Sequence, residues 1–227
     1  MLFTDKRLNI MIGAYGSGKS EVAVNCALKM KENRPSGKVL MADMDIVNPF
    51  YRSADAKELL EKNGIRVIIP SYANSNVDAP VLTGEMYVIF DDEDYSGVFD
   101  IGGEDMGANV LGSLKSRLAK IDCNLIMVVN TLRPFTADVE GILKMGSELQ
   151  EASRMKISGF INNTNLLEQT TFSEVLDGEK TVLEASERCG IPLLATTIME
   201  GVATEEELKS LKAPEVILMK RSINYSF

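Results

Sequence analysis

The stretch GAYGSGKS, Gly13 to Ser20, decides the expected fold because it satisfies the pattern G-x-x-x-x-G-K-[ST]. It follows an apolar run over residues 8–12 and precedes an apolar-periodic segment, as a loop between a buried strand and a helix would. Glycines let the backbone N–H groups of such a loop surround an anion, and the following helix adds the positive end of its dipole. We therefore expect a phosphate-binding loop rather than a plain glycine turn.

Two side chains of this loop have expected roles of their own. Lys19 is expected to reach the β- and γ-phosphates and to act in catalysis, and Ser20 is expected to ligate Mg²⁺. The residues of this segment expected to contact a bound nucleotide are Gly13, Ala14, Tyr15, Gly16, Ser17, Gly18, Lys19, Ser20 and Glu21.

The composition favours one globular domain and disfavours binding to bare nucleic acid. At 227 residues the chain can bury a sizeable α/β core, and no linker-like segment divides it, so we expect a single domain over 1–227. The formal charge of −9 makes direct nucleic-acid binding an unfavoured function. No apolar segment approaches the roughly 18 residues of a membrane span and no signal-peptide pattern opens the chain, so we expect a cytoplasmic protein.

Histidine is absent, which excludes Ser-His and Cys-His catalysis and imidazole-based metal sites. The three cysteines, Cys26, Cys123 and Cys189, are far apart and form no C-x-x-C pair. They indicate neither a disulfide framework nor a self-contained zinc site, and a site shared through Cys123 by two copies is the less favoured alternative. Any chemistry must then use carboxylates, lysines, a metal ion or bound phosphate.

Short apolar runs alternate with helical patterns along the chain, which is typical of a parallel sheet with helices on its faces. We expect an α/β fold of the P-loop NTPase kind: three layers, with a doubly wound, mostly parallel sheet and helices on both faces. The expected strands are 8–12, 38–43, 66–69, 97–100, 124–130, 156–162, 192–197 and 216–219. The expected helices are 19–31, 54–63, 108–120, 137–152, 180–189 and 205–211.

One region, near 70–95, is longer than a simple strand connection needs. It is interpreted as an irregular insert, with an extra hairpin, a partner-binding loop and an ordinary insertion as open alternatives. Its acidic run, Asp91 to Asp94, is expected to be a solvated turn, since adjacent acids do not converge on one cation without a shaped loop.

Acidic residues stand where two of the expected strands end, and ligands of open α/β sheets bind beyond the carboxyl ends of strands. Asp43 and Asp45 follow one strand, in DMDIVNP, and Asp100 follows another, in VFDIGG. We expect Asp100 to hold Mg²⁺ through its water shell, Asp45 to lie at the metal and orient the attacking water, and the Gly103 N–H to reach the γ-phosphate. Asp43 is expected to tie the strand end to the loop.

With these motifs the chain resembles the MinD/ParA-like ATPases, a branch of the P-loop proteins. DMDIVNP is similar to the D-x-D motif of that group, and VFDIGG is similar to its D-x-x-G switch. GFINNTN, residues 159–165, is similar to the segment whose asparagine recognises adenine, here Asn163, and IPLLATTIMEG is similar to the segment beside the base, with Met199 as a contact. A guanine-specific N-K-x-D is missing from GFINNTN. The resemblance implies that ATP or ADP and Mg²⁺ are the cofactors.

The sequence departs from the group inside the phosphate loop. Members with the pattern K-G-G-x-G-K use its first lysine to reach the phosphates of a second subunit, but Ala14 and Tyr15 stand here. A homodimer driven by that lysine is therefore in question. Arg52 or Arg133 could supply a compensating charge, and Tyr15 could cover the phosphates or contact a partner.

Three functions follow as alternatives. The leading one is a Mg²⁺-dependent ATPase that acts as a molecular switch for a partner protein of unknown identity. The second is an ATP-dependent small-molecule kinase or ligase of the dethiobiotin or cobyrinate amide synthase type, with 70–95 framing the acceptor. The third is a nucleotide-binding module that does not hydrolyse. The C-terminal PEVILMKRSINYSF is expected to be a last strand and a tail rather than a membrane anchor.

Overall fold

The computed structural model describes residue 3 and residues 5–44, 53–69, 84–102 and 104–222. Its centre is one eight-stranded sheet in the order β3-β2-β4-β1-β5-β6-β7-β8, with every registered pair of neighbours parallel. The strands are β1 (Leu8–Ile12), β2 (Lys38–Met44), β3 (Ile65–Ile68), β4 (Tyr95–Ile101), β5 (Cys123–Val129), β6 (Gly159–Asn162), β7 (Leu193–Met199) and β8 (Glu215–Met219).

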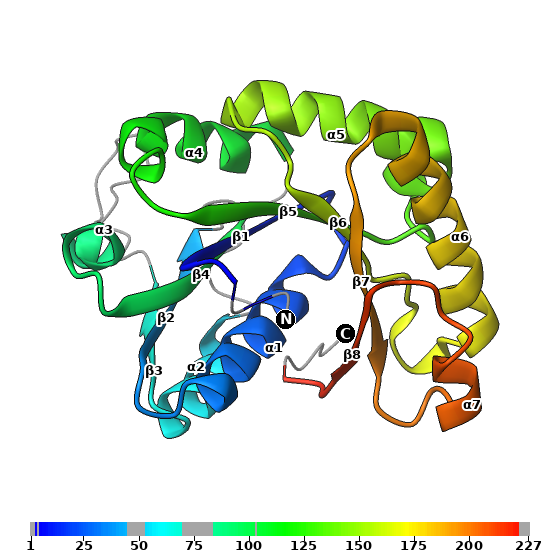
Figure 1. Cartoon of the computed structure of the whole chain (residues 1–227), viewed down its shortest axis with the longest axis horizontal. Helices are drawn as coiled ribbons and strands as arrows, with labels where there is room; N and C mark the ends of the chain where they lie inside the picture. The colour runs from blue at the N-terminus through cyan, green and yellow to red at the C-terminus, as the bar shows by residue number, and fades with distance from the viewer. Residues whose placement is uncertain (1–2, 4, 45–52, 70–83, 103, 223–227) are drawn as a thin grey trace.

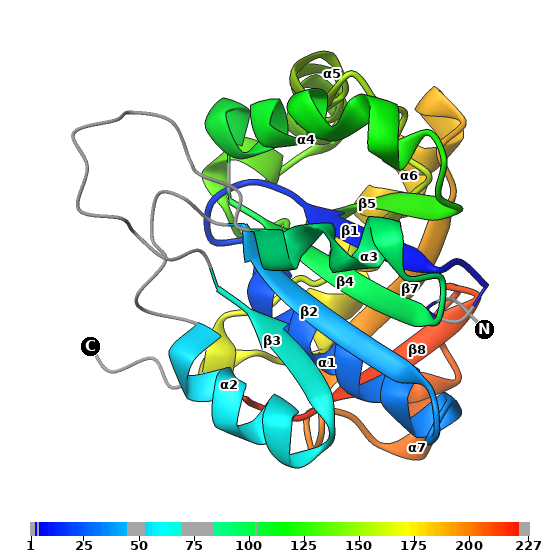
Figure 2. The same cartoon turned by 90° about the vertical axis from the view of Figure 1, so that its left-hand side faces the viewer.

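Helices cover both faces of this sheet, and Figures 1 and 2 show α4 and α5 on one side and α1 and α2 on the other. This confirms the expected three-layer, doubly wound α/β fold. The helices are α1 (Lys19–Asn33), α2 (Ser53–Lys62), α3 (Val88–Asp91), α4 (Glu104–Leu118), α5 (Val139–Ser153), α6 (Phe172–Cys189) and α7 (Glu205–Leu208), with short turns η2 (Gly84–Tyr87), η3 (Pro134–Thr136) and η4 (Leu167–Gln169). Within the described ranges, no helix has the length and apolar character needed to cross a bilayer.

Strand β1 shows how the sequence builds two cores at once. All five of its residues are buried. Leu8, Ile10 and Ile12 belong to the core beneath α3, α4, α5 and α6, whereas Met11 belongs to the core beneath α1 and α2. Because successive side chains of a strand point to opposite faces, a strand covered on both faces appears in the sequence as a continuous apolar run.

Most boundaries lie within a few residues of the expected ones; the start of α6 differs most, and α7 is shorter than expected. α6 begins at Phe172 instead of residue 180, because Thr171 and Glu174 form a capping box at its start. α7 ends at Leu208 after a single turn, although a helix over 205–211 was expected. Both corrections lie in the half of the sheet that follows β6.

Part of the expected insert, residues 70–83, lies outside the described residues. The part that is described is residues 84–95, of which residues 84–91 form η2 and α3 and are helical. Of the three alternatives, the extra hairpin does not agree with this segment.

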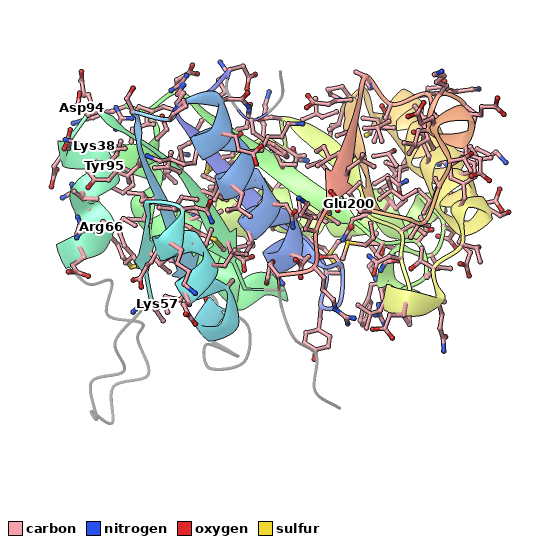
Figure 3. All side chains as sticks on the ribbon, turned by 90° about the horizontal axis from the view of Figure 1, so that it is seen from below. Lys38, Lys57, Arg66, Asp94, Tyr95 and Glu200 are labelled. Atoms are coloured by element: carbon pink, nitrogen blue, oxygen red, sulfur yellow. The ribbon has the colours of Figure 1, made fainter. Side chains whose placement is uncertain are left out.

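The acidic run that follows α3 pairs with a neighbouring strand. Lys38 Nζ lies 3.0 Å from the Asp92 carboxylate and 3.2 Å from the Asp94 carboxylate. Figure 3 shows Lys38, Asp94 and Tyr95 together at one edge of the molecule. The hydrogen bond from Lys38 holds the pKa of Asp92 below its usual value. These acids thus neutralise a lysine at the start of β2.

Candidate nucleotide-binding site

The loop Gly13–Ser20 joins β1, near the middle of the sheet, to the first turn of α1. Gly16 and Gly18 have φ angles of +78° and +80°, in the left-handed region that glycine adopts without steric cost. The Ser17 N–H donates to the Ala14 carbonyl over 3.1 Å and closes the turn. Gly18, the N-cap residue of α1, offers no side-chain cap, which is compatible with the expected role of the first-turn N–H groups in binding phosphate.

Two polar side chains of the loop belong to buried residues and pair with no described residue. Lys19 is 2% exposed and forms no hydrogen bond or ion pair with any described residue. The Ser17 Oγ is also buried and has no hydrogen-bond partner within the described part of the chain. Burying an ammonium group without a counter-ion is costly, and an anion held by the loop would remove that cost.

Two of the three predicted strand-end acids lie side by side next to this loop. Asp43 of β2 is the register partner of Asp100 of β4, and Asp100 is also the register partner of Met11 of β1. Each carboxylate residue is only 3% exposed. The parallel pairing of β1, β4 and β2 thus confirms that these strand ends meet.

The oxygen donors present fit Mg²⁺, which prefers hydroxyl, carboxylate, water and phosphate oxygens. Ser20 and Asp100 are the predicted Mg²⁺ ligands that the structure describes, whereas the third, Asp45, lies outside the described residues. Gly103, whose N–H is expected to reach the γ-phosphate, also lies outside them. The described residues hold no group of three histidine, cysteine or acidic side chains that could bind a metal alone. A Mg²⁺ ion here would therefore need waters and phosphate oxygens to complete its shell.

Asn163, the predicted adenine contact, links the phosphate loop to the sheet. Its Nδ2 donates to the Ser17 carbonyl over 2.7 Å, and its Oδ1 accepts from Thr197 Oγ1 over 2.6 Å. A Cβ on Gly18 would lie 2.3 Å from the same Nδ2, so the two segments approach closely. Sequence reasoning missed Thr197, although a polar residue near the end of a buried strand was a readable signal. A contact of Asn163 with adenine stays a prediction.

A cavity of about 390 Å³ opens beside Gly18 and Asn163. Apolar side chains form much of its wall, and the predicted base contact Met199 is one of them. Such a cavity suits a flat, largely apolar ring system with polar edges. The apolar wall consists of Leu167, Val175, Ile198, Met199, Val202 and Met219.

The rim of this cavity includes the segment after β8, which the sequence did not place there. The Ser222 N–H donates to the Glu21 carboxylate over 2.7 Å, and Arg221 forms an ion pair with Glu168. Glu200, labelled in Figure 3, lies 3.7 Å from Lys220 Nζ on the same rim. Glu21, expected to contact nucleotide, thus has its carboxylate bonded to the C-terminal segment.

The outer side of the phosphate loop carries the residues that depart from the MinD/ParA-like pattern. Ala14 is fully buried, whereas Tyr15 is 56% exposed and lies with Phe135 along a second cavity of about 390 Å³. Arg133 Nε donates to the Gly16 carbonyl over 3.1 Å. Arg52, the other candidate for a compensating charge, lies outside the described residues.

The cysteines take no part in the site. All three are free, as expected, and burial raises the pKa of the Cys26 thiol well above its usual value. Burial also raises the pKa of the Cys123 thiol, so both stay protonated at neutral pH.

Comparison with known proteins identifies solved structures of similar fold but no family to which the chain belongs. No family model matches the sequence. No curated protein matches it. The signal recognition particle receptor FtsY from Elizabethkingia anophelis is similar in structure, with 15% identity and a TM-score of 0.53 over 93% of this chain and 63% of FtsY. The cell division protein FtsY from Thermotoga maritima gives 15% identity and a TM-score of 0.59 over 87% of this chain and 63% of that protein.

FlhF complexed with GTP and Mg²⁺ is a weaker match, with 14% identity and a TM-score of 0.48 over 73% of this chain and 57% of FlhF, and has no bearing on function here. The chain spans about three fifths of the length of the solved proteins. At these identities the likeness shows the fold alone, which is the α/β fold of the P-loop NTPases. FtsY belongs to the SIMIBI class of these proteins, to which the MinD/ParA-like group is related. Membership of the MinD/ParA-like group itself stays a prediction.

Proposed function

We propose that this chain binds ATP with Mg²⁺, hydrolyses it slowly and uses the nucleotide state as a switch for a partner protein. The observation that supports nucleotide binding is Lys19, which is buried at the start of α1 without a negative partner among the described residues. The β- and γ-phosphates of a nucleotide would supply that negative charge.

The remaining parts of the proposal divide the nucleotide between the loop and the larger cavity. The loop Gly13–Ser20 would bind the phosphates, and the cavity beside Asn163 and Met199 would take the base. Ser20, Asp100 and Asp45 would hold Mg²⁺, which neutralises charge on the phosphates when it is bound. Asp45 would in addition orient the attacking water.

The switch would reside in residues 43–49 and 100–107, which begin in the last residues of β2 and β4 and continue beyond these strands. Their first residues, Asp43 and Asp100, are adjacent strand-end acids next to the phosphate loop. A segment in this place can contact the γ-phosphate and Mg²⁺, so its conformation would depend on whether ATP or ADP is bound. A partner protein that binds one conformation would then respond to hydrolysis.

The full chain is the material for the test, with calorimetry for binding and phosphate release for hydrolysis. We expect wild-type protein to bind MgATP more tightly than MgGTP, and Lys19→Ala to weaken MgATP binding by at least about tenfold. Lys180→Ala is the matched control, because Lys180 is an exposed lysine on α6 that pairs with Asp177. Asp45→Asn should slow hydrolysis more than it weakens binding.

Each other outcome corrects a defined part of the proposal. Absence of nucleotide binding, or equal binding by Lys19→Ala and wild type, would refute it. Tighter binding of GTP would overturn the choice of adenine. Phosphate release that starts only when a metabolite is added would favour the kinase or ligase, and ATP that survives purification would favour the module without hydrolysis.

A further inference from the structure

Arg133 lies directly against the backbone of the phosphate loop. It stands between β5 and η3, and its Nε donates to the Gly16 carbonyl over 3.1 Å. A Cβ built on Gly16 would lie 3.1 Å from that Nε and 3.5 Å from the guanidinium carbon. The arginine side chain therefore occupies the space beside Gly16 that any other residue would fill.

The segment that presents Arg133 is held on several sides. The Asn130 carbonyl accepts from the Arg133 N–H over 3.1 Å and from Thr136 Oγ1 over 2.7 Å. The Asn130 side chain accepts from the Leu132 N–H over 3.0 Å and donates to the Asn165 carbonyl over 3.0 Å. Arg133 is thus positioned by a folded turn and not by a free loop.

The two neighbouring carbonyls of the phosphate loop are both bonded from outside the loop. Gly16 accepts from Arg133, and Ser17 accepts from Asn163. A carbonyl engaged in this way is kept from turning toward a bound anion, which would repel it. The N–H groups of the loop are then left to face the anion.

The guanidinium also brings an unneutralised positive charge to this place. No carboxylate among the described residues forms an ion pair with Arg133, in a protein whose formal charge is −9. A guanidinium has five N–H donors, and its contact with Gly16 uses one of them. The charge therefore stands next to the loop that holds the buried Lys19.

We propose that Arg133 is a positioning residue of the phosphate site and supplies, within one protomer, the positive charge that a lysine at position 14 would bring from a second subunit. The inference rests on the proposed phosphate binding by the loop. It implies that one protomer carries a complete phosphate site. Binding should then be independent of protein concentration.

The test measures MgATP binding to the full chain by calorimetry at two protein concentrations. Arg133→Ala should weaken binding by about tenfold or more, and Arg133→Gln, which keeps an amide donor without the charge, should lose most of that affinity as well. Arg133→Lys, which keeps the charge and one donor, should stay within about threefold of wild type. Arg188→Ala, an exposed arginine that pairs with Glu140, is the control and should bind as wild type does.

A second measurement needs no nucleotide. Hydrogen exchange of the peptide that covers residues 13–18 should be faster in Arg133→Ala and Arg133→Gln than in wild type, and unchanged in Arg188→Ala. If wild type binds MgATP and the Arg133 variants bind equally well, the role of Arg133 is wrong while the proposed function stands. If wild type does not bind, both fail. If MgATP binding becomes tighter as the protein concentration rises, the inference that one protomer carries a complete phosphate site is wrong.

Discussion

At the scale of a single residue, Asn163 connects two separate parts of the candidate site by hydrogen bonds. One side-chain amide joins the phosphate loop, through the Ser17 carbonyl, to β7, through the Thr197 hydroxyl. The residue is 2% exposed, so neither bond competes with bulk water. When one partner of a buried hydrogen bond is removed, the remaining donor or acceptor stays desolvated without a bond, which costs free energy of folding.

Asn163→Ala is therefore expected to lower the free energy of unfolding by about 1–3 kcal/mol, because the buried Ser17 carbonyl loses its donor and Thr197 Oγ1 keeps only its 3.2 Å contact with the Asn162 carbonyl. Urea denaturation measures this loss. If Asn163 also contacts adenine, the same variant should lose more affinity for MgATP than for inorganic tripolyphosphate, which has no base. Equal losses for both ligands would leave Asn163 with a structural role only, and unchanged stability would contradict the hydrogen-bond argument.

The sequence could place Asn163 near the site only through the resemblance of GFINNTN to the adenine-recognising segment of the MinD/ParA-like group. The sequence also identified Asp43 and Asp100 as strand-end acids, which the structure shows to be register partners. It could not supply the partner of the amide, because Ser17 is 146 residues away in the chain and its carbonyl is a backbone group without a pattern of its own. Contacts of this kind depend on the loop conformation, which the sequence does not encode locally.

At the scale of an element, the sequence of α6 explains why its start was predicted at residue 180 and not at Phe172. The Thr171–Glu174 pair is a readable start signal, but Gly178 follows it and interrupts the helical pattern. The structure explains this glycine, since a Cβ at Gly178 would lie 2.1 Å from Thr164 Oγ1. The helix thus accepts a poor helix former so that it can approach the loop beside the cavity.

Gly178→Ala should consequently destabilise the protein by about 1–3 kcal/mol, because the clash with Thr164 outweighs the gain in helix propensity. Gly146→Ala in α5 is the matched control. Gly146 is also buried in a helix, but the nearest atoms to its Cβ would lie 3.7 Å away. The control should be neutral or more stable by up to about 1 kcal/mol. Thermal and urea unfolding compare the two, and equal effects would refute the close approach of α6.

At the scale of the whole molecule, the first helix and the last strand meet beside the candidate nucleotide site. α1 follows the phosphate loop, and β8 and residues 220–222 lie beside α1 (Figure 1). Lys29 Nζ lies 2.6 Å from the Glu215 carboxylate, and Ser222 bonds to Glu21. The sequence predicted the last strand almost to its bounds. The sequence did not predict that β8 lies beside α1, because the position of a strand follows from the packing of the whole sheet and not from any local pattern.

Asn25 offers a direct test of the contact between α1 and the residues that follow β8. Its side-chain amide forms two hydrogen bonds with the backbone of Lys220. Nδ2 donates to the Lys220 carbonyl over 3.1 Å, and the Lys220 N–H donates to Oδ1 over 3.0 Å. Asn25→Ala should lower the free energy of unfolding by about 1–2 kcal/mol. It should also weaken MgATP binding several-fold, since Lys220 and Arg221 line the cavity proposed for the base.

Asn33→Ala is the matched control, because Asn33 is an exposed asparagine of the same helix whose amide, within the described part of the chain, bonds only to the Lys29 carbonyl. It should change the free energy of unfolding by less than about 0.5 kcal/mol and leave binding unchanged. A stability loss without a loss of affinity would mean that the segment after β8 supports the fold but not the cavity. Equal behaviour of the two variants would show that the first helix and the last strand hold together without Asn25.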